Sequence, residues 1–175
     1  MHKYIAFLRA INVGGTTIIK MTDLKQMFES FGLDQVQTYI QTGNVIFESA
    51  QGNASTLEQQ IERQLEKAYG KRIQLFVRTM RQVVEMAAEC PFDPTGDETV
   101  HVVILREKPS KKALDALLAL RNEADDFAVL GKDAYNLRRD RAKSIFTNNW
   151  IEKVLGVSGT TRNLTTIRKL AEKFG

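Results

Sequence analysis

Cations, amides and glycines gather in one segment near the start of the chain, between a short apolar stretch and the first expected helix. The segment runs from Leu8 to Lys20, and its polar or flexible positions are Arg9, Asn12, Gly14, Gly15 and Lys20. Connections usually have about 4 to 6 residues, and longer ones are often functional. Paired glycines let backbone N–H groups approach an anion, and the two cations would add charge. The segment predicts contact with an anion, although a turn with positive φ would also require glycine.

The glycine pair does not complete a known nucleotide-binding motif. After Gly14 and Gly15 the chain lacks the final residues of a P-loop, and no G-x-G-x-x-G occurs anywhere. His2 and His101 lie far apart, without cysteine or carboxylate at ligand spacing, so no metal site is expected. Cys90 fits an apolar helix face and is expected to be packed rather than nucleophilic. No metal or cofactor is therefore predicted.

Two further blocks carry amides, hydroxyls and an arginine. Gln41 and Asn44 flank an expected hairpin turn, and because the ends of neighbouring strands meet in a sheet, they could point toward the first segment. Thr161 and Arg162 are expected just before the last helix, and Asn163 is expected at its start. Free N–H groups and the helix dipole favour an anion there. Ordinary turn and capping roles would explain most of the same residues, but not Arg162.

Positive charge is concentrated in the last part of the chain. From position 138 onward there are nine Lys or Arg against three acids, whereas the preceding residues carry a net charge of −2. Such an excess favours an anionic partner, either a phosphate ester or a nucleic-acid backbone, although a solvated helical surface would look the same. The excess comprises Arg138, Arg139, Arg141, Lys143, Lys153, Arg162, Arg168, Lys169 and Lys173.

Hydrophobic periodicity predicts one ferredoxin-like plait in the first half of the chain. Strands are expected at 3–8, 36–41, 45–48 and 73–78, with helices that begin at Thr22 and Ser55 and end at Gly32 and Gly70. This βαββαβ order is that of the ferredoxin-like fold. The strands would turn one apolar face away from these helices, and the second half of the chain is expected to cover it. That face is expected to carry Tyr4, Ala6, Leu8, Tyr39 and Phe76.

The second half predicts a related plait. A helix capped by Thr79 ends before Pro91, and the Pro- and Gly-containing run that follows marks the expected boundary. Strands at 100–105, 127–130 and 134–137 alternate with helices at 109–120, from Ser144, and at 163–174. We therefore predict an α+β protein of two packed ferredoxin-like subdomains. The expected divisions are an N-terminal subdomain at 1–79, a connecting helix and linker at 80–98, and a C-terminal subdomain at 99–175.

Composition places the chain among folded proteins. Of its 175 residues, 43% are hydrophobic and 26% charged, and no apolar run approaches the roughly 20 residues that span a bilayer. The start of the chain enters a strand directly and has no signal-peptide pattern, and one cysteine builds no disulfide framework. We expect a cytoplasmic protein without a membrane partner, as a monomer or weak homodimer.

Three blocks together resemble a bacterial family of proteins of unknown function, numbered DUF1697. They are residues 4–15, residues 39–47, and residues 160–163 before Lys169-Leu170, and the likeness covers essentially the whole chain. The resemblance implies a cytoplasmic protein with two ferredoxin-like subdomains and no established activity. In one place the sequence departs from the family, because residues 138–143 are basic where the family tends toward a loop with proline and glycine.

The first functional hypothesis is a binding protein for a small anionic or phosphorylated ligand, held in a cleft between the subdomains. Its site would combine Arg9, Asn12, Gly14, Gly15, Lys20, Gln41, Asn44, Thr161, Arg162 and Asn163. The alternative is nucleic-acid binding through the C-terminal basic surface, with strongly salt-dependent affinity. A third is an enzyme that uses the same pocket, with Arg162 or Lys20 as an electrostatic stabiliser. No general base stands out in the sequence.

Overall fold

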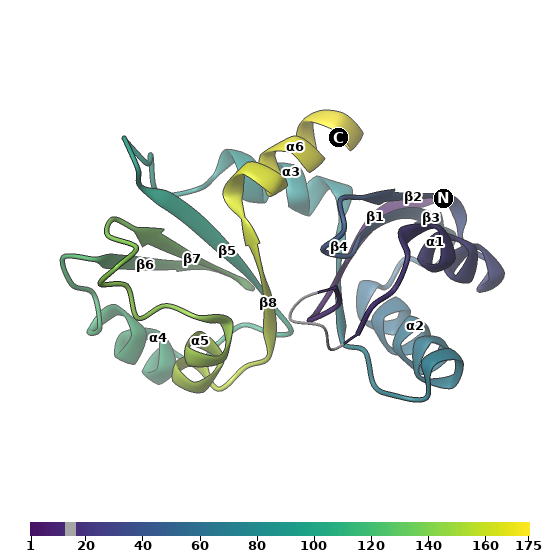
Figure 1. Cartoon of the computed structure of the whole chain (residues 1–175), viewed down its shortest axis with the longest axis horizontal. Coiled ribbons are helices and arrows are strands. Elements are labelled where there is room, and N and C mark those ends of the chain that lie inside the picture. Colours follow the sequence, from purple (N-terminus) through teal and green to yellow (C-terminus); the bar gives the residue numbers. More distant parts are fainter. Residues whose placement is uncertain (13–16) are drawn as a thin grey trace. The chain divides into compact units, whose positions relative to one another are not determined.

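A computed structural model describes residues 1–12 and 17–175 of the chain. The order strand, helix, strand, strand, helix, strand, helix occurs twice along the backbone (Figure 1). Met1–Val84 and Leu170–Gly175 form unit 1, and Glu85–Lys169 form unit 2. The predicted fold class, α+β with two ferredoxin-like subdomains, is confirmed. Within the described ranges, no helix is long and apolar enough to cross a membrane.

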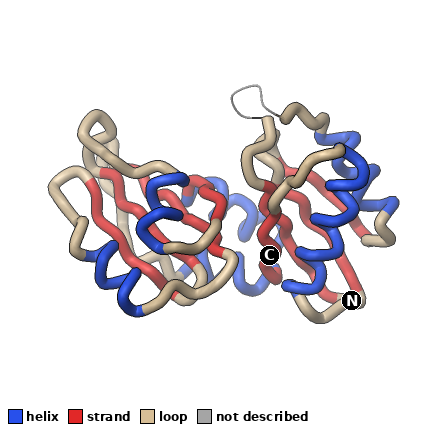
Figure 2. Tube along the Cα trace, turned by 90° about the horizontal axis from the view of Figure 1, so that it is seen from below, coloured by secondary structure: helices blue, strands red, loops and turns tan. Residues whose placement is uncertain are grey.

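Unit 1 contains a four-stranded antiparallel sheet with the strand order β2-β3-β1-β4. Helix α1 connects β1 to β2, and α2 connects β3 to β4, so each connection passes over a strand that lies between. The elements are β1 (His2–Leu8), α1 (Met21–Ser30), β2 (Asp34–Tyr39), β3 (Asn44–Ser49), α2 (Ala54–Tyr69), β4 (Leu75–Thr79) and α3 (Met80–Ala88). Strands and helices form separate layers, as Figure 2 shows for each unit.

Unit 2 repeats this topology with the strand order β6-β7-β5-β8. Helices α4 and α5 make the two connections that α1 and α2 make in unit 1. The elements are β5 (Thr99–Leu105), α4 (Lys111–Leu118), β6 (Asp125–Leu130), β7 (Asp133–Arg138), α5 (Asn148–Leu155), β8 (Gly159–Asn163) and α6 (Leu164–Phe174). Helix α3 crosses from unit 1 to unit 2 after Val84, and α6 crosses back after Lys169.

Strand β8 corrects one sequence expectation. Residues 159–162 were expected to precede the last helix as a loop and Asn163 to begin that helix, but residues 159–163 pair antiparallel with β5 from Leu105 to His101. The segment Gly-Thr-Thr-Arg-Asn lacks the apolar alternation by which a half-buried strand is recognised. Its backbone bonds are supplied by β5, which is distant in sequence. The second plait is therefore as complete as the first.

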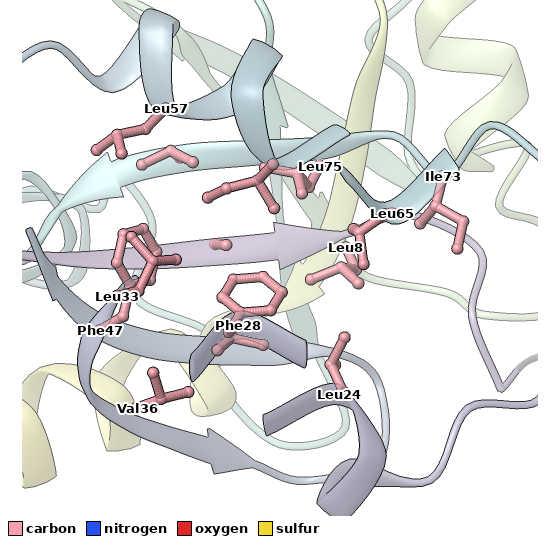
Figure 3. Packing of buried hydrophobic residues seen from close by; sticks show 14 of the residues in the cluster. Leu8, Leu24, Phe28, Leu33, Val36, Phe47, Leu57, Leu65, Ile73 and Leu75 are labelled. Atoms are coloured by element: carbon pink, nitrogen blue, oxygen red, sulfur yellow. The ribbon is translucent and has the colours of Figure 1, made fainter. Parts of the chain in front are cut away.

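The core of unit 1 lies between its sheet and helices α1 and α2. Figure 3 shows Leu24 and Phe28 of α1, Leu57 of α2 and Leu8 of β1 around this core. Tyr4, Ala6 and Leu8 all belong to it, so the expectation that they turn away from the helices is wrong. Alternate residues of a strand point to opposite faces, and the face that turns away carries Ile5 and Phe7 instead.

The second face of the unit 1 sheet is the one expected to carry Tyr39 and Phe76. Tyr39 pairs with Asn44 and Phe76 with Phe7, which places both on this face. The Phe174 ring of α6 lies edge-on to the Tyr39 ring, with the centroids 6.1 Å apart, and the Phe174 carbonyl accepts a 3.0 Å hydrogen bond from Lys3 Nζ. The end of α6 therefore packs against unit 1.

Unit 2 has its own core on the face covered by α4 and α5. Val103, Leu117, Phe127, Ile151 and Leu155 are buried there together. On the opposite face of the sheet, the Tyr135 hydroxyl donates a 3.1 Å hydrogen bond to the carbonyl of Met86 in α3. Burial raises the pKa of Tyr135, so this hydroxyl keeps its proton and remains a donor.

Candidate functional site

In unit 1 the predicted N-terminal segment and the β2–β3 turn are joined by one side chain, that of Asn12. Its Nδ2 donates to the carbonyls of Ile19 and Gln41, each at 2.9 Å, and its Oδ1 accepts from the Ile19 N–H at 2.8 Å. The Asn12 N–H also donates to the Thr17 carbonyl. Asn12 thus joins Thr17 and Ile19 to the β2–β3 turn. Gly14 and Gly15 lie outside the described residues.

Left-handed backbone recurs in the described part of these two segments. Among the described residues there, φ is positive at Ala10 (54°), Asn12 (55°), Ile40 (52°) and Gly43 (84°). This conformation is uncommon for residues other than glycine, and each such residue costs about 1 to 3 kcal/mol. Such backbone conformations persist only where the surrounding contacts hold the chain in place. The two segments are therefore held in a strained and specific conformation.

The other predicted residues of unit 1 differ in accessibility. Arg9 is half-buried, and its NH1 donates to Gln74 Oε1 at 2.9 Å, while Lys20 and Gln41 are exposed. Asn44 is fully buried, and its Nδ2 donates to the Tyr39 carbonyl at 2.9 Å and to Thr42 Oγ1 at 3.1 Å. These contacts show that the Asn44 amide shapes the turn. Among the described members, Arg9, Asn12, Lys20 and Gln41 have solvent access.

The third predicted block lies in unit 2, on β8. Thr161 pairs with Val103 and Arg162 with Val102, so the two side chains lie on opposite faces of the sheet. Thr161 Oγ1 donates to Asn148 Oδ1 of α5 at 2.7 Å. Asn163 Oδ1 accepts from the Thr165 N–H at 2.9 Å, as an N-cap residue of α6 does.

Arg162 is buried and has an equivalent in the other plait. Its NH1 donates to Thr160 Oγ1 at 3.0 Å and to the carbonyl of the preceding residue at 2.9 Å, and burial lowers its pKa to about 10. Arg78 holds the same position in β4, one residue before the strand ends, and its NH1 donates to the preceding carbonyl at 3.2 Å. The two plaits therefore share a buried arginine at corresponding strand positions.

The basic stretch at 138–143 is partly committed to contacts within unit 2. Arg138 donates to Ser144 Oγ and to the Phe146 carbonyl, each at 3.2 Å. Arg139 lies 3.4 Å from Asp126 Oδ2 and 3.9 Å from Glu98 Oε1. Nucleic-acid binding depends on cations that neutralise phosphates. Two cations of this stretch already have acceptors within the chain, so the fold gives the nucleic-acid alternative no added support.

Beside this stretch, Asp125 is the centre of a buried polar network. Its Oδ1 accepts from Asn136 Nδ2 at 3.0 Å and from Ser144 Oγ at 2.7 Å, and its Oδ2 accepts from the Ile145 N–H at 3.1 Å. Ser144 Oγ also accepts from Arg138 Nε at 3.2 Å and from the Phe146 N–H at 3.3 Å, so this hydroxyl has a structural role in the network. The network ties β6, β7 and the loop before α5 together.

His101 lies next to this network, opposite Asn136 in the β5–β7 pairing. Its ring stacks on the Phe146 ring with the centroids 5.5 Å apart. Among the atoms that the structure describes, its Nδ1 and Asn136 Oδ1 are buried without a hydrogen-bond partner. Burial and then the charge of Arg138 lower the pKa of His101, and Asn136 and Asp125 only partly oppose this.

We expect the stability of the protein to fall as the pH is lowered from about 7.5 to 5.5. Because the folded-state pKa of His101 lies below its ordinary value of 6.5, the unfolded chain binds the proton first. The contribution of neutral His101 to stability is complete above pH 6.5 and is lost as the pH falls from there through the folded-state pKa. Urea denaturation across this range measures the effect. His101→Phe should remove this dependence and His2→Gln should keep it, whereas an unchanged profile in His101→Phe would assign it elsewhere.

Sequence reasoning did not find a pocket of about 580 Å³ in unit 2, which we call the lysine pocket. It lies where the start of α4 approaches the end of α5. Its lining includes three exposed lysines, Lys108, Lys112 and Lys153, one carboxylate, Glu107, and an apolar wall. The remaining lining residues are Ser110, Ala113, Ala116, Val154, Leu155, Gly156 and Val157.

Local sequence explains the shape of the lysine pocket. Ser110 caps α4 by accepting from the Ala113 N–H, which fixes where the helix begins. Ala113 and Ala116 are three residues apart, so they share one face of α4, and their small side chains leave space there. Gly156, at φ +66°, ends α5 and turns the chain along the pocket wall.

Charge in the lysine pocket is unbalanced. Three lysines against one glutamate give its lining two net positive charges. The neighbouring Lys111 is paired with Asp115 at 2.7 Å, but within the described part of the chain no ion pair joins Lys108, Lys112 or Lys153 to a carboxylate. A hollow whose lining has an excess of positive charge attracts anions. The pocket is therefore suited to a negatively charged ligand.

Comparison with known proteins supports the fold. A family model described as a protein of unknown function, DUF1697, matches residues 1–135. Among solved structures, the conserved bacterial protein SP0830 from Streptococcus pneumoniae is similar, with a TM-score of 0.71 and 20% identity over 98% of this chain and 97% of its own. At this identity the likeness concerns the fold alone. A search of curated proteins gave no match.

Proposed function

The chain belongs to the DUF1697 family of proteins of unknown function, and we propose that this member binds a small anionic ligand in the lysine pocket. The observation that carries the proposal is the convergence of Lys108, Lys112 and Lys153 on one pocket. They come from three different segments: the loop before α4, the first turn of α4 and the last turn of α5. A volume of about 580 Å³ lies within the range of roughly 300 to 1,000 Å³ that is usual for small-molecule sites.

This proposal keeps the ligand class expected from the sequence but gives it another location. Among the predicted residues of unit 1, Asn12 and Asn44 use their side-chain amides to hold strained backbone in place. Arg162 of unit 2 is buried in its own sheet. The lysine pocket, in contrast, has both volume and accessible positive charge within a single unit.

Titration with inorganic phosphate, followed by ¹H–¹⁵N NMR at low salt, tests this function. We expect saturable shifts of the amides at 107–116 and 153–157, and weaker binding at higher salt because exposed charges are screened. Lys112→Gln and Lys153→Gln should each weaken binding by about two- to fivefold, the size of one partly exposed charge contact.

Lys111→Gln is the matched control. It removes the same charge from the same helix, but Lys111 does not line the pocket. Binding should therefore be nearly unchanged in this variant. Equal losses in Lys111→Gln and Lys112→Gln would indicate only a general surface potential. No shifts at any phosphate concentration would refute an anion site.

A further inference from the structure

We infer, on the basis of the proposed function, that the ligand of the lysine pocket is a phosphomonoester that carries a small apolar or aromatic body. The lining of the pocket combines two kinds of side chain. It contains three lysines, which we call its charged side, and aliphatic side chains from α4, α5 and the segment after α5, which we call its apolar side. A ligand that uses both sides must combine charge with apolar surface.

The apolar side is larger than a bare anion requires. Leu155 and Val157 are buried, Val154 is half-buried, and all three line the pocket together with Ala113 and Ala116. One water molecule has a share of about 30 Å³ in the liquid, so inorganic phosphate, with five heavy atoms, would fill only a small part of about 580 Å³. The remaining space is bounded by surface that an apolar group would remove from water.

The charged side matches a dianion better than a monoanion. Its lining carries two net positive charges, from three lysines and Glu107. A phosphomonoester carries about −1.5 to −2 at pH 7, whereas a carboxylate carries −1. Lysine ammonium groups act as point charges on flexible stems and do not require the fixed planar geometry of arginine pairs. They can therefore follow the three phosphate oxygens.

The small side chain of Ala116 leaves space in the pocket for the apolar part of the ligand. Ala116 is exposed on α4 and lines the pocket, so a larger side chain there would occupy the space for the ligand body without disturbing the core. The lysines would remain in place. Ala119 follows at the end of the same helix and does not line the pocket. The two positions form a matched pair for testing the apolar side alone.

Three probes separate the contribution of the phosphate group from that of the apolar part of the ligand. They are inorganic phosphate, phenyl phosphate and benzoate. Titrations followed by ¹H–¹⁵N NMR and calorimetry should give an affinity for phenyl phosphate at least about tenfold above that for either other probe. Ala116→Leu should lower the affinity for phenyl phosphate toward that for inorganic phosphate. Ala119→Leu should affect neither, and Lys153→Gln should weaken both phosphates.

The outcomes distinguish this inference from the proposed function. If inorganic phosphate shifts the pocket amides but phenyl phosphate binds no better, the function stands and the inference about the ligand body is wrong. Ala116→Leu should keep its circular dichroism spectrum. If this variant still binds phenyl phosphate with unchanged affinity, the phenyl group does not occupy the apolar side of the pocket. If none of the probes binds at low salt, both the function and the inference are refuted.

Discussion

Replacing Gly43 with alanine is expected to lower the free energy of unfolding by about 2 to 5 kcal/mol. Two costs add at this position. Gly43 has a φ of +84°, which side chains other than that of glycine rarely tolerate. An added Cβ would also lie 2.6 Å from Ile11 Cδ1, 2.9 Å from Ile11 Cγ1 and 3.0 Å from Leu8 Cβ. Urea denaturation followed by circular dichroism measures the loss.

Gly32→Ala provides the matched control for Gly43→Ala. Gly32 has nearly the same φ, +80°, but apart from its chain neighbours no atom of the described residues lies within 4 Å of its added Cβ. This variant should therefore lose only the backbone cost, about 1 to 2 kcal/mol. Ile11→Ala should reduce the additional loss at Gly43, because it removes the contacting atoms. Equal losses in both glycine variants would contradict the close approach of Ile11 to the turn.

Asp125→Ala is expected to cost about 3 to 5 kcal/mol, the usual loss when one partner of a buried charged network is removed. The change would leave the donors of Asn136, Ser144 and Ile145 without the carboxylate in a buried environment. Trp150, the single tryptophan, stacks near Phe127 in the same unit, with the ring centroids 5.4 Å apart. Its fluorescence during urea denaturation should therefore report this loss.

Two variants calibrate the Asp125 result. Asp125→Asn keeps the shape and one carbonyl acceptor, so its loss should be smaller than that of Asp125→Ala. Asp115→Asn changes a carboxylate that is exposed on α4 and paired only with Lys111, and stability should hardly change. A similar, small loss in all three variants would mean that the buried network does not hold β6, β7 and the loop before α5 together.

Much of the fold was accessible from hydrophobic periodicity. The three polar blocks predicted the family that the match over residues 1–135 confirms, and the alternation of strands and helices predicted both plaits. The argument that strand ends meet also predicted the proximity of Gln41 to the first segment, which the Asn12 bond shows. These inferences succeeded because they depend on local patterns and on one well-defined topology.

The remaining features depend on contacts between distant residues. Strand β8 has two threonines, an arginine and an asparagine, and only its pairing with β5 makes it a strand. Lys108, Lys112 and Lys153 each look like an ordinary surface charge in the sequence, and Ala116 looks like a helix former. Their common pocket exists only because α4 and α5 pack together. No local pattern carries that information.

The return of α6 to unit 1 has a consequence for how the chain is made. A ribosome completes β1 to β4 early, but Leu170–Gly175, which belong to the same unit, follow only after all of unit 2. Until Phe174 reaches Tyr39, one side of the nascent first sheet lacks a hydrophobic contact that it has in the finished protein. The unit whose synthesis begins first is thus completed last, and exposed apolar surface of this kind promotes aggregation during folding.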